Sequence, residues 1–199
     1  MTEPELALDD GPVAHEAPRD ADGQAAETRL RELVDTHHDF VWRSLRRLGV
    51  PGGDVDDGAQ RVFLTASRKL GAIRPGAERS FLFQTALRVA ADSRRTHRRR
   101  REVAESAGDE QTAERAPGAE ELLDLYRARK HLDRILDEME LDLRAVFVLF
   151  ELDQLTMAEI AELLDLPAGT VASRLRRARV QFREKAAASP PASPAGGAP

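Results

Sequence analysis

The stretch LTMAEIAELLDLPAGTVASRLRRARVQF, Leu155–Phe182, decides the fold of the second half of the chain. Thr156 and Glu159 have the T-x-x-E spacing of a capping box, in which two side chains satisfy free backbone amides where a helix begins. Turn-forming residues follow at 165–169, and apolar residues then recur at helical spacing at Val171, Leu175, Ala178 and Phe182. The pattern predicts a short helix, a tight turn and a second helix, which is the helix-turn-helix arrangement that enters the DNA major groove.

The outer face of the second helix would carry the residues that read DNA. Hydroxyl and guanidinium groups on such a face can donate to base edges and to phosphates. A solvated basic helix is the alternative for an isolated arginine-rich segment, but the capped helix and the turn before it favour DNA binding. We assign the DNA contacts to Thr170, Ser173, Arg174, Arg176, Arg177 and Arg179.

The formal net charge of -5 hides a segregated distribution of charge. Residues 1–28 contain eight acidic side chains against one arginine, and residues 102–121 contain seven against one. In the rest of the chain, basic side chains outnumber acidic ones by eight. A basic body with acidic flexible segments suits a nucleic-acid partner, either because the segments compete with DNA or because they only keep the chain soluble.

Composition also excludes several classes of site. The chain has no cysteine, so it has no disulfide, thiol nucleophile or Cys-ligated zinc. No apolar run approaches the length of a membrane span, and the first residues are acidic where a signal peptide would be basic. We therefore expect a cytoplasmic protein without membrane insertion. Residues 1–28 should form a disordered acidic arm and residues 187–199 a disordered Pro/Ala tail, because neither can bury enough apolar surface to order itself.

Helical patterning predicts a first domain over residues 29–101, with helices at about 29–48, 54–70 and 78–101. Asp54 fits the N-cap of the second helix, whereas Gly58 inside that helix should cost about 1 kcal/mol relative to Ala. The third helix ends in a dense run of arginines beside a single acid, Asp92. Such a run predicts an anionic partner, although a solvated charge run near a helix C-terminus is the alternative.

A second domain is expected over residues 122–186, after an acidic flexible linker at 102–121. It begins with helical patterning and contains a strongly apolar helix at 143–150, with more apolar surface than so small a domain needs to bury. No segment alternates with period two, and Gly-rich phosphate loops are absent from the sequence. The expected fold is all-α, with two small helical domains joined by a flexible linker and a helix-turn-helix in the second.

The order of these elements resembles bacterial RNA polymerase sigma factors of the small extracytoplasmic-function type, which have two structured domains. The segment DVDDGAQRVF from Asp54 is similar to the core-binding helix of that family, and FLFQTALRVAADSRRTHRRRR from Phe81 is similar to its promoter-melting helix. The closer match is LRAVFVLFELDQLTMAEIAELLDLPAGTVASRLRRAR from Leu143. The resemblance covers most of residues 29–186.

The resemblance implies a protein that binds core RNA polymerase and promoter DNA and helps to open the duplex, with no covalent step, cofactor or metal of its own. It places contacts with the polymerase clamp helices at Asp54, Asp57, Gln60 and Phe63, and contacts with the polymerase flap at Val146, Phe147 and Phe150. Contacts with the "-10" element fall on the loop at 71–76 and on Arg88, Asp92, Arg94, Arg95, Arg98 and Arg99. The "-35" contacts fall on the second helix of the helix-turn-helix. Whether an anti-sigma factor holds the protein inactive stays open.

Some residues depart from the pattern of the family. Gly58 and Arg61 stand where it usually has Leu and Glu, and Val89 stands where it commonly has Asn. In the second domain, Glu140 replaces a usual Pro and Gln154 a frequent Gly. We expect these departures to change the detail of the clamp contact and to leave the fold intact.

Other classes of function explain less of the sequence. A helix-turn-helix repressor or activator leaves the first domain without a role. A metal-dependent phosphohydrolase could start from His37, His38 and Asp39, but the remaining ligands are missing, and His37 fits a core-facing position. An anti-sigma or scaffolding protein would not need the recognition-helix arginines.

Overall fold

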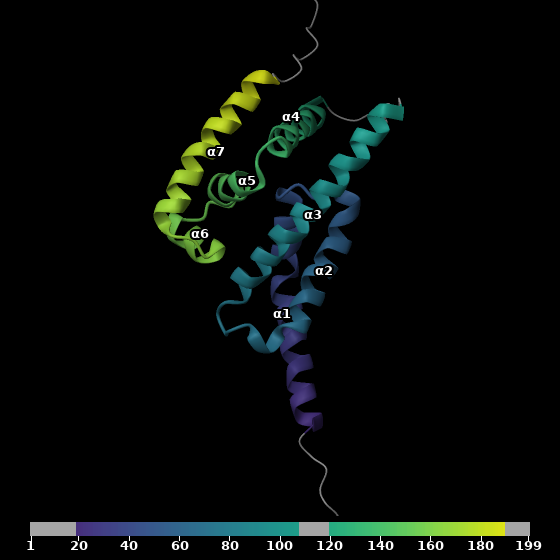
Figure 1. Cartoon of the computed structure of the whole chain (residues 1–199), viewed down its shortest axis with the longest axis vertical. Coiled ribbons are helices and arrows are strands. Elements are labelled where there is room, and N and C mark those ends of the chain that lie inside the picture. Colours follow the sequence, from purple (N-terminus) through teal and green to yellow (C-terminus); the bar gives the residue numbers. More distant parts are fainter. Residues whose placement is uncertain (1–18, 108–119, 190–199) are drawn as a thin grey trace, which may run out of the picture.

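The computed structural model describes the backbone of residues 19–107 and 120–189, and all regular structure in those ranges is helical (Figure 1). The first domain consists of α1 (Arg19–Arg47), α2 (Val55–Arg68) and α3 (Glu78–Ala107), with 3-10 turns at Gly52–Asp54 and Leu70–Ala72. The second consists of α4 (Glu120–Asp137), α5 (Leu141–Phe147), a π-helical turn (Val148–Leu152), α6 (Met157–Leu164) and α7 (Ala168–Ala188). None of the described helices is long and apolar enough to cross a membrane.

The long helices reach further than the sequence pattern indicates. Residues 19–28 of the expected arm belong to α1, and residues 102–107 of the expected linker belong to α3. Adding a residue to an existing helix costs far less than nucleating a new one, and good helix formers such as Ala25, Ala26 and Glu27 allow the extension. Residues 1–18, 108–119 and 190–199 lie outside the described parts, so the disorder expected there stays a prediction.

Gly58 has a packing role inside α2. It is buried, and a Cβ there would come within 3.2 Å of the Leu45 Cδ1 atom on α1 and 3.6 Å of the Val89 Cγ1 atom on α3. The absence of a side chain therefore lets α2 approach α1 closely, whereas the distance to Val89 on α3 is an ordinary van der Waals contact. Two departures from the family pattern, Gly58 and Val89, thus meet in one contact of the core.

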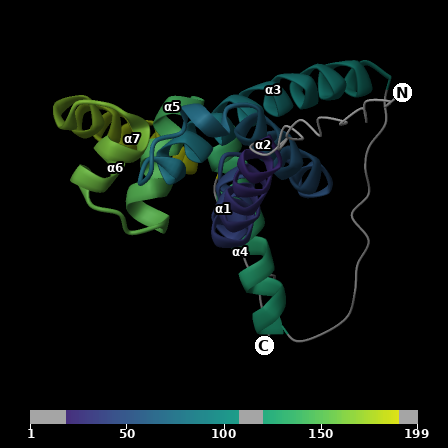
Figure 2. The ribbon, with the colours of Figure 1, turned by 90° about the horizontal axis from the view of Figure 1, so that it is seen from below.

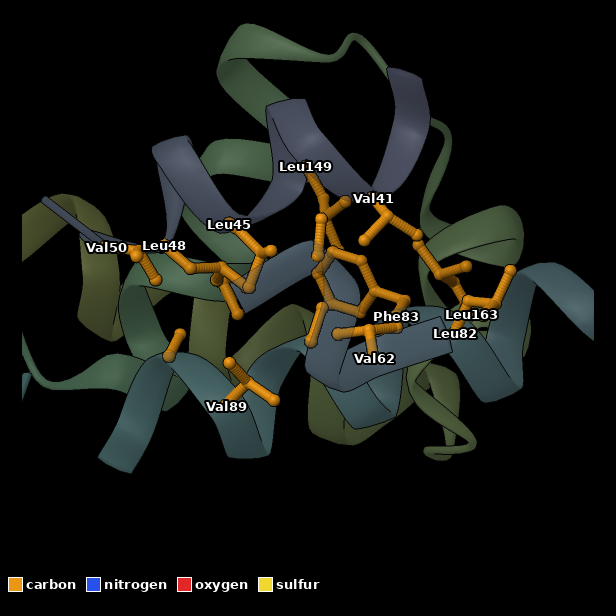
Figure 3. Close-up of a cluster of buried hydrophobic side chains, with 14 of the residues drawn as sticks. Val41, Leu45, Leu48, Val50, Val62, Leu82, Phe83, Val89, Leu149 and Leu163 are labelled. Carbon is orange, nitrogen blue, oxygen red and sulfur yellow. The ribbon is translucent and has the colours of Figure 1, made fainter. Parts of the chain in front are cut away.

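The two domains share a single hydrophobic core. Leu149 and Leu163 of the second domain lie among buried side chains of the first, including Val41, Leu45 and Phe83 (Figure 3). Figures 1 and 2 show α5, α6 and α7 gathered along one side of the α1–α3 bundle. A smaller cluster, formed by Leu136, Met139, Leu143, Phe147, Val148 and Ala178, holds α4, α5 and α7 together. The excess apolar surface predicted for residues 143–150 is therefore covered within the chain itself.

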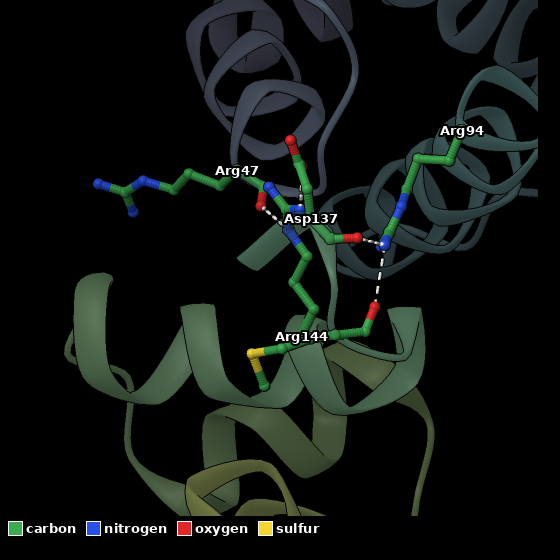
Figure 4. A network of polar contacts seen from close by, with 5 residues as sticks. Arg47, Arg94, Asp137 and Arg144 are labelled. Carbon is green, nitrogen blue, oxygen red and sulfur yellow. Dashed lines mark hydrogen bonds and ion pairs between the residues drawn. The ribbon is translucent and has the colours of Figure 1, made fainter. Parts of the chain in front are cut away.

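A buried arginine joins the two domains at the end of α1. The Arg144 side chain on α5 is only 2% exposed. Its Nε donates to the carbonyl oxygen of Arg47 at 2.6 Å, and its Nη1 donates to the Asp137 Oδ1 atom at 2.6 Å (Figure 4). Arg47 is the last residue of α1, so its carbonyl has no partner within the helix. Arg144 thus satisfies a helix end of the first domain from within the second.

Two further donors of the first domain satisfy helix ends of the second. The Arg94 Nη2 atom on α3 donates to the carbonyl oxygens of Asp137 and Met139, at 2.7 and 2.9 Å, just where α4 ends (Figure 4). The Ser80 hydroxyl, also on α3, donates to the carbonyl oxygen of Leu163 at 3.0 Å in the last turn of α6. Because these carbonyls carry the negative end of the helix dipole, a guanidinium is a favourable partner.

Gly49→Ala is expected to destabilise the protein by about 1–3 kcal/mol, because a non-glycine residue is strained at positive φ. Gly49 has φ +96, and a Cβ on it would lie 2.7 Å from the Arg144 Nη1 atom. Chemical denaturation measures the change. Gly53→Ala is the matched control, since a Cβ there would have no atom within 4 Å. Equal free energies of unfolding for the two variants would show that neither the positive φ nor the close approach of Arg144 constrains the residue at position 49.

Candidate nucleic-acid interface

The helix-turn-helix predicted at 155–182 is present, and its local chemistry matches the prediction. The Thr156 hydroxyl accepts from the Glu159 amide at 3.3 Å, and the Glu159 carboxylate accepts from the Thr156 amide at 2.8 Å, which completes the capping box. Helix α6 ends at Leu164, the next residue Asp165 has a left-handed backbone with φ 53°, and α7 begins after Pro167. The buried face of α7 contains Val171, Leu175 and Ala178, as the spacing predicts.

The predicted recognition residues lie on the outer side of α7. Ser173, Arg176, Arg177 and Arg179 are exposed, whereas Thr170 and Arg174 are partly buried. The Ser173 hydroxyl donates back to the Thr170 carbonyl at 2.9 Å, so it must rotate before it can donate to a ligand. The arrangement presents several guanidinium groups on one helix face, which suits phosphates and base edges.

Acidic side chains of the same domain accompany three of these arginines. Arg174 pairs with Asp142 at 3.1 Å, and Arg177 lies 3.7 Å from Glu140. The Arg179 Nε atom donates to Glu151 at 2.8 Å. These acids lie far from α7 in the chain, at the start of α5 and in the π-helical turn, so the sequence pattern does not indicate the pairs. They pair with guanidinium groups that the sequence analysis assigns to DNA.

The arginines of α3 fall into two groups. Arg88, Arg95, Arg98 and Arg99 are exposed along the helix, and Asp92 lies beside them within 3.6 Å of Arg61. Arg94 instead turns into the contact between the two domains, where burial lowers its pKa below the ordinary value. The structure therefore brings most of the predicted "-10" residues to one surface and separates Arg94 from them.

Arg29 on α1 supports the loop that precedes α3. Its Nη1 donates to the Leu70 carbonyl at 3.1 Å, and its Nη2 donates to the Ile73 carbonyl at 2.6 Å. The same guanidinium lies 3.6 Å from the Glu78 carboxylate. The loop itself remains exposed from Arg74 to Ala77. A basic residue at the start of an amphipathic helix carries no specific signal, so the sequence does not indicate this role for Arg29.

Two of the four predicted clamp-contact residues border an apolar groove of about 370 Å³ between α1 and α2. Gln60 and Phe63 line it together with apolar side chains of α1, and Phe63 stacks against His38 with ring centroids 6.3 Å apart. Asp57 is exposed in the first turn of α2. Asp54 occupies the N-cap position but makes no capping hydrogen bond, because the preceding 3-10 turn gives it a helical backbone conformation.

The predicted flap-contact residues are the least accessible of the candidate residues. Val146 has no exposed surface and belongs to the core that the two domains share. Phe147 is buried and stacks on Phe182 of α7, with ring centroids 4.7 Å apart. Phe150 is partly buried beneath the Arg179 guanidinium, 5.2 Å from its ring centroid. In this arrangement, Val146 and Phe147 present little surface to a partner.

The alternative metal site gains no support from the geometry. In the parts of the chain that the structure describes, no group of three or more His, Asp or Glu side chains could hold a metal ion. His37 is partly buried on the core side of α1, and this burial lowers its pKa below the ordinary value. A structural role for His37 agrees with these observations.

Two segments of the chain match models of known protein families. Residues 33–100 match the family model described as Sigma-70 region 2, and residues 129–182 match the model described as Sigma-70, region 4. The "ECF RNA polymerase sigma-E factor" of Escherichia coli K12 is 33% identical over 170 residues, which cover 81% of this chain and 89% of that protein. The "ECF RNA polymerase sigma factor SigE" of Mycolicibacterium smegmatis is 33% identical over 167 residues, covering 83% of this chain and 65% of that protein.

A solved structure has a similar fold. The structure of CnrH in complex with the cytosolic domain of CnrY aligns with a TM-score of 0.57 and 25% identity. The alignment covers 83% of this chain and 94% of that chain, so it includes both helical domains.

The capping box makes the stability of the protein dependent on pH. The hydrogen bond from the Thr156 backbone amide, and then that from its hydroxyl, lower the pKa of Glu159 from its ordinary value of 4.5. A depressed folded-state pKa contributes stability above the unfolded pKa, and this contribution is lost as the pH falls through the folded one. Glu159→Gln should therefore lower the thermal midpoint at pH 7, and the gap from wild type should close in acid.

The control for this change is Glu162→Gln, in the same helix, whose side chain takes no part in the capping box. Thermal unfolding followed by circular dichroism from neutral to acidic pH compares the three proteins. A gap for Glu159→Gln that stays constant over this range would show that the charge of the carboxylate does not stabilise the helix.

Asp142→Asn is expected to strengthen the binding of duplex DNA of any sequence and to steepen the dependence of affinity on salt. The change removes a negative charge that lies 3.1 Å from Arg174 and that would repel the phosphate backbone of any duplex. Glu138→Gln is the matched control, because Glu138 pairs with Lys185, which is not one of the predicted DNA contacts. Fluorescence anisotropy over a salt series measures the affinity for duplex DNA and its dependence on salt. Identical salt slopes for the two variants would show that Asp142 does not weaken DNA binding.

Proposed function

This chain belongs to the ECF RNA polymerase sigma factors, and we propose that it binds core RNA polymerase and directs transcription initiation at a specialised set of promoters. The observation that carries the proposal is the exposed guanidinium face of α7 behind a capped helix and turn. The same chain presents a second arginine surface on α3. One protein can thus hold two separated promoter elements.

In this proposal, each domain contacts a different promoter element. We assign the "-35" element to α7, and the "-10" element to the exposed arginines of α3 and the loop that Arg29 supports. Arginines neutralise the backbone of an opened strand, and an exposed loop can accept an unstacked base. The protein performs no covalent step, and it acts where the polymerase and the chromosome are, in the cytoplasm.

The groove between α1 and α2 favours a polymerase partner over a helix-turn-helix regulator that acts alone. Its lining is mainly apolar and includes Leu30, Val34 and Phe63, together with the polar residues Gln60 and Asp56. Apolar patches rimmed by polar residues mark protein interaction sites. A regulator that only binds DNA has no need of this surface, whereas a sigma factor must hold the polymerase.

A run-off transcription assay tests the proposal. Purified core RNA polymerase is combined with the full chain and with DNA from upstream of its own gene and from other candidate promoters. A discrete transcript that depends on the chain supports a sigma factor. Sequence-specific DNA binding by the chain alone, without a transcript or co-purification with core polymerase, would support a conventional helix-turn-helix regulator.

The two arginine surfaces should respond differently to substitution. Arg174→Ala is expected to weaken promoter binding by the holoenzyme by about 1–3 kcal/mol and to relax the preference at one "-35" position. Arg98→Ala and Arg99→Ala should weaken binding to all promoters alike and reduce the salt slope, because each removes a phosphate contact. Binding to promoters with single-base changes, measured over a salt series, distinguishes a base contact from a phosphate contact. An equal loss on all sequences for Arg174→Ala would reassign it to phosphate.

A further inference from the structure

We propose that Arg29 is a positioning residue for promoter recognition, which holds the loop between α2 and α3 in the shape that discriminates the unstacked base of the "-10" element. This inference deepens the proposed function and rests on it. Arg29 lies outside residues 33–100, the segment that matches the family model for region 2. The family match therefore supplies no role for this residue, and the argument for one comes from its contacts.

The tip of this loop is a preformed turn. The Ala77 amide donates to the Arg74 carbonyl oxygen at 3.0 Å, which closes a four-residue turn over residues 74–77. Pro75 fits the second position of a type II turn, and Gly76 has φ +85, the positive value that the third position of this turn requires. All four residues are exposed. The tip therefore offers a base a defined backbone shape at an accessible site.

The chain before the tip is anchored by two buried side chains and by the Arg29 guanidinium. Leu70 and Ile73 are buried, and Arg29 donates to both of their carbonyl oxygens, at 3.1 and 2.6 Å. The Leu70 carbonyl also accepts from the Ile73 amide at 3.2 Å, so the 3-10 turn and the guanidinium share one acceptor. Hydrogen bonds from a charged donor are stronger than those between neutral groups. Arg29 therefore fixes the point from which the exposed tip departs.

The same guanidinium also contacts the chain after the tip. The Arg29 Nη2 atom lies 3.6 Å from the Glu78 Oε1 atom, and Glu78 is the first residue of α3. A carboxylate at this position interacts favourably with the positive end of the helix dipole. Figure 1 shows that the connection from α2 to α3 runs beside α1. One side chain of α1 thus joins the two ends of the loop, with contacts at Ile73 before the tip and at Glu78 after it.

The contacts of Arg29 favour a positioning role over a direct contact with DNA. Its side chain is 36% exposed, and both terminal nitrogens donate to loop carbonyl oxygens. Arg74 and Arg79, in contrast, are exposed arginines in and beside the loop. Phosphates can reach those two side chains without breaking the contacts that shape the loop. Arg29 therefore acts on the base through the loop backbone.

Order in the free loop affects specificity more than affinity. A loop that is ordered before binding does not lose conformational entropy when it takes up a base. A loop of fixed shape also rejects bases that do not fit it, whereas a flexible binding surface repacks around several ligands. Loss of the Arg29 contacts should therefore reduce the discrimination between bases at the unstacked position more than it reduces the overall affinity for promoters.

Three variants and a matched control separate the contributions of the guanidinium. Arg29→Met removes every donor and keeps an unbranched apolar side chain. Arg29→Lys keeps the charge but replaces the planar fork, which donates to two carbonyls, with a single ammonium group. Glu78→Gln removes the charge at the α3 end of the loop. The control is Arg31→Met, on the same helix, where Arg31 is exposed and pairs with Glu27. Circular dichroism confirms that each variant is folded.

Hydrogen exchange of the free full-length chain tests the order of the loop without polymerase or DNA. The Ile73 and Ala77 amides, which donate to loop carbonyls, report on it. We expect both amides to exchange faster in Arg29→Met, to exchange at an intermediate rate in Glu78→Gln, and to keep the wild-type rate in Arg31→Met. Amides of α7 should exchange alike in all proteins. Wild-type protection of the loop in Arg29→Met would overturn the inference.

Promoter binding by the holoenzyme tests the consequence for specificity. The probes are the promoter that gives a transcript in the run-off assay and its derivatives with single-base changes in each element. We expect Arg29→Met to reduce the preference at one "-10" position by about two- to tenfold, the factor that corresponds to ordering one side chain. The preference at the "-35" element and the affinity for core polymerase should equal those of wild type. Arg29→Lys should fall between the two, and Arg31→Met should match wild type.

Other results would assign Arg29 a different role. An equal loss on all promoter sequences, with a reduced salt slope, would show that Arg29 contacts phosphate and overturn the inference. Full discrimination by Arg29→Lys would show that a charge suffices and that the fork does not position the loop. Reduced preference at both promoter elements would indicate a general loss of structure. A wild-type chain that neither binds core polymerase nor gives a transcript would contradict the proposed function instead, whatever the exchange of the loop amides.

Discussion

The buried guanidinium of Arg144 is the interaction on which the arrangement of this protein depends. Removing a charge from water is costly unless the charge is paired and hydrogen-bonded, and burial accordingly lowers the pKa of Arg144. Asp137 and the end of α1 supply its partners, one from each domain. Because Arg144 is satisfied only when α1, α4 and α5 meet, it specifies their relative position more narrowly than apolar contact can.

The main polar contacts between the domains are made at the C-terminal ends of helices. Each helix leaves carbonyl groups without intrahelical partners, and these must be satisfied when the end is buried. Here the ends of α1, α4 and α6 accept hydrogen bonds from Arg144, Arg94 and Ser80, each across the domain boundary. The contact leaves the outer faces of α7 and most of α3 exposed, while it covers Val146. The arginine surfaces that we propose for DNA binding thus face solvent, whereas Val146 is buried between the domains.

Local patterns in the sequence predicted the helix-turn-helix well, since Thr156, Glu159 and the apolar face of α7 act within a few residues of one another. The contact between the domains could not be predicted in this way, because Arg144 and the Arg47 carbonyl are 97 residues apart in the chain. One clue was present: Arg144 is the only charged residue among residues 143–150. A single charge in an apolar helix requires a buried partner, but the sequence does not indicate which one. The same limit applies to Asp142, which approaches Arg174 only through the packing of α5 on α7.

The central claim is that the free chain builds one core from both domains. Nuclear Overhauser effects between methyl groups in the full-length protein test it most directly, with isotope labels on leucine and valine. The account predicts contacts between methyl groups of α1–α3 and those of Val146, Leu149 and Leu163 across the domain boundary. Contacts confined to residues within each domain, with none across the boundary, would contradict it.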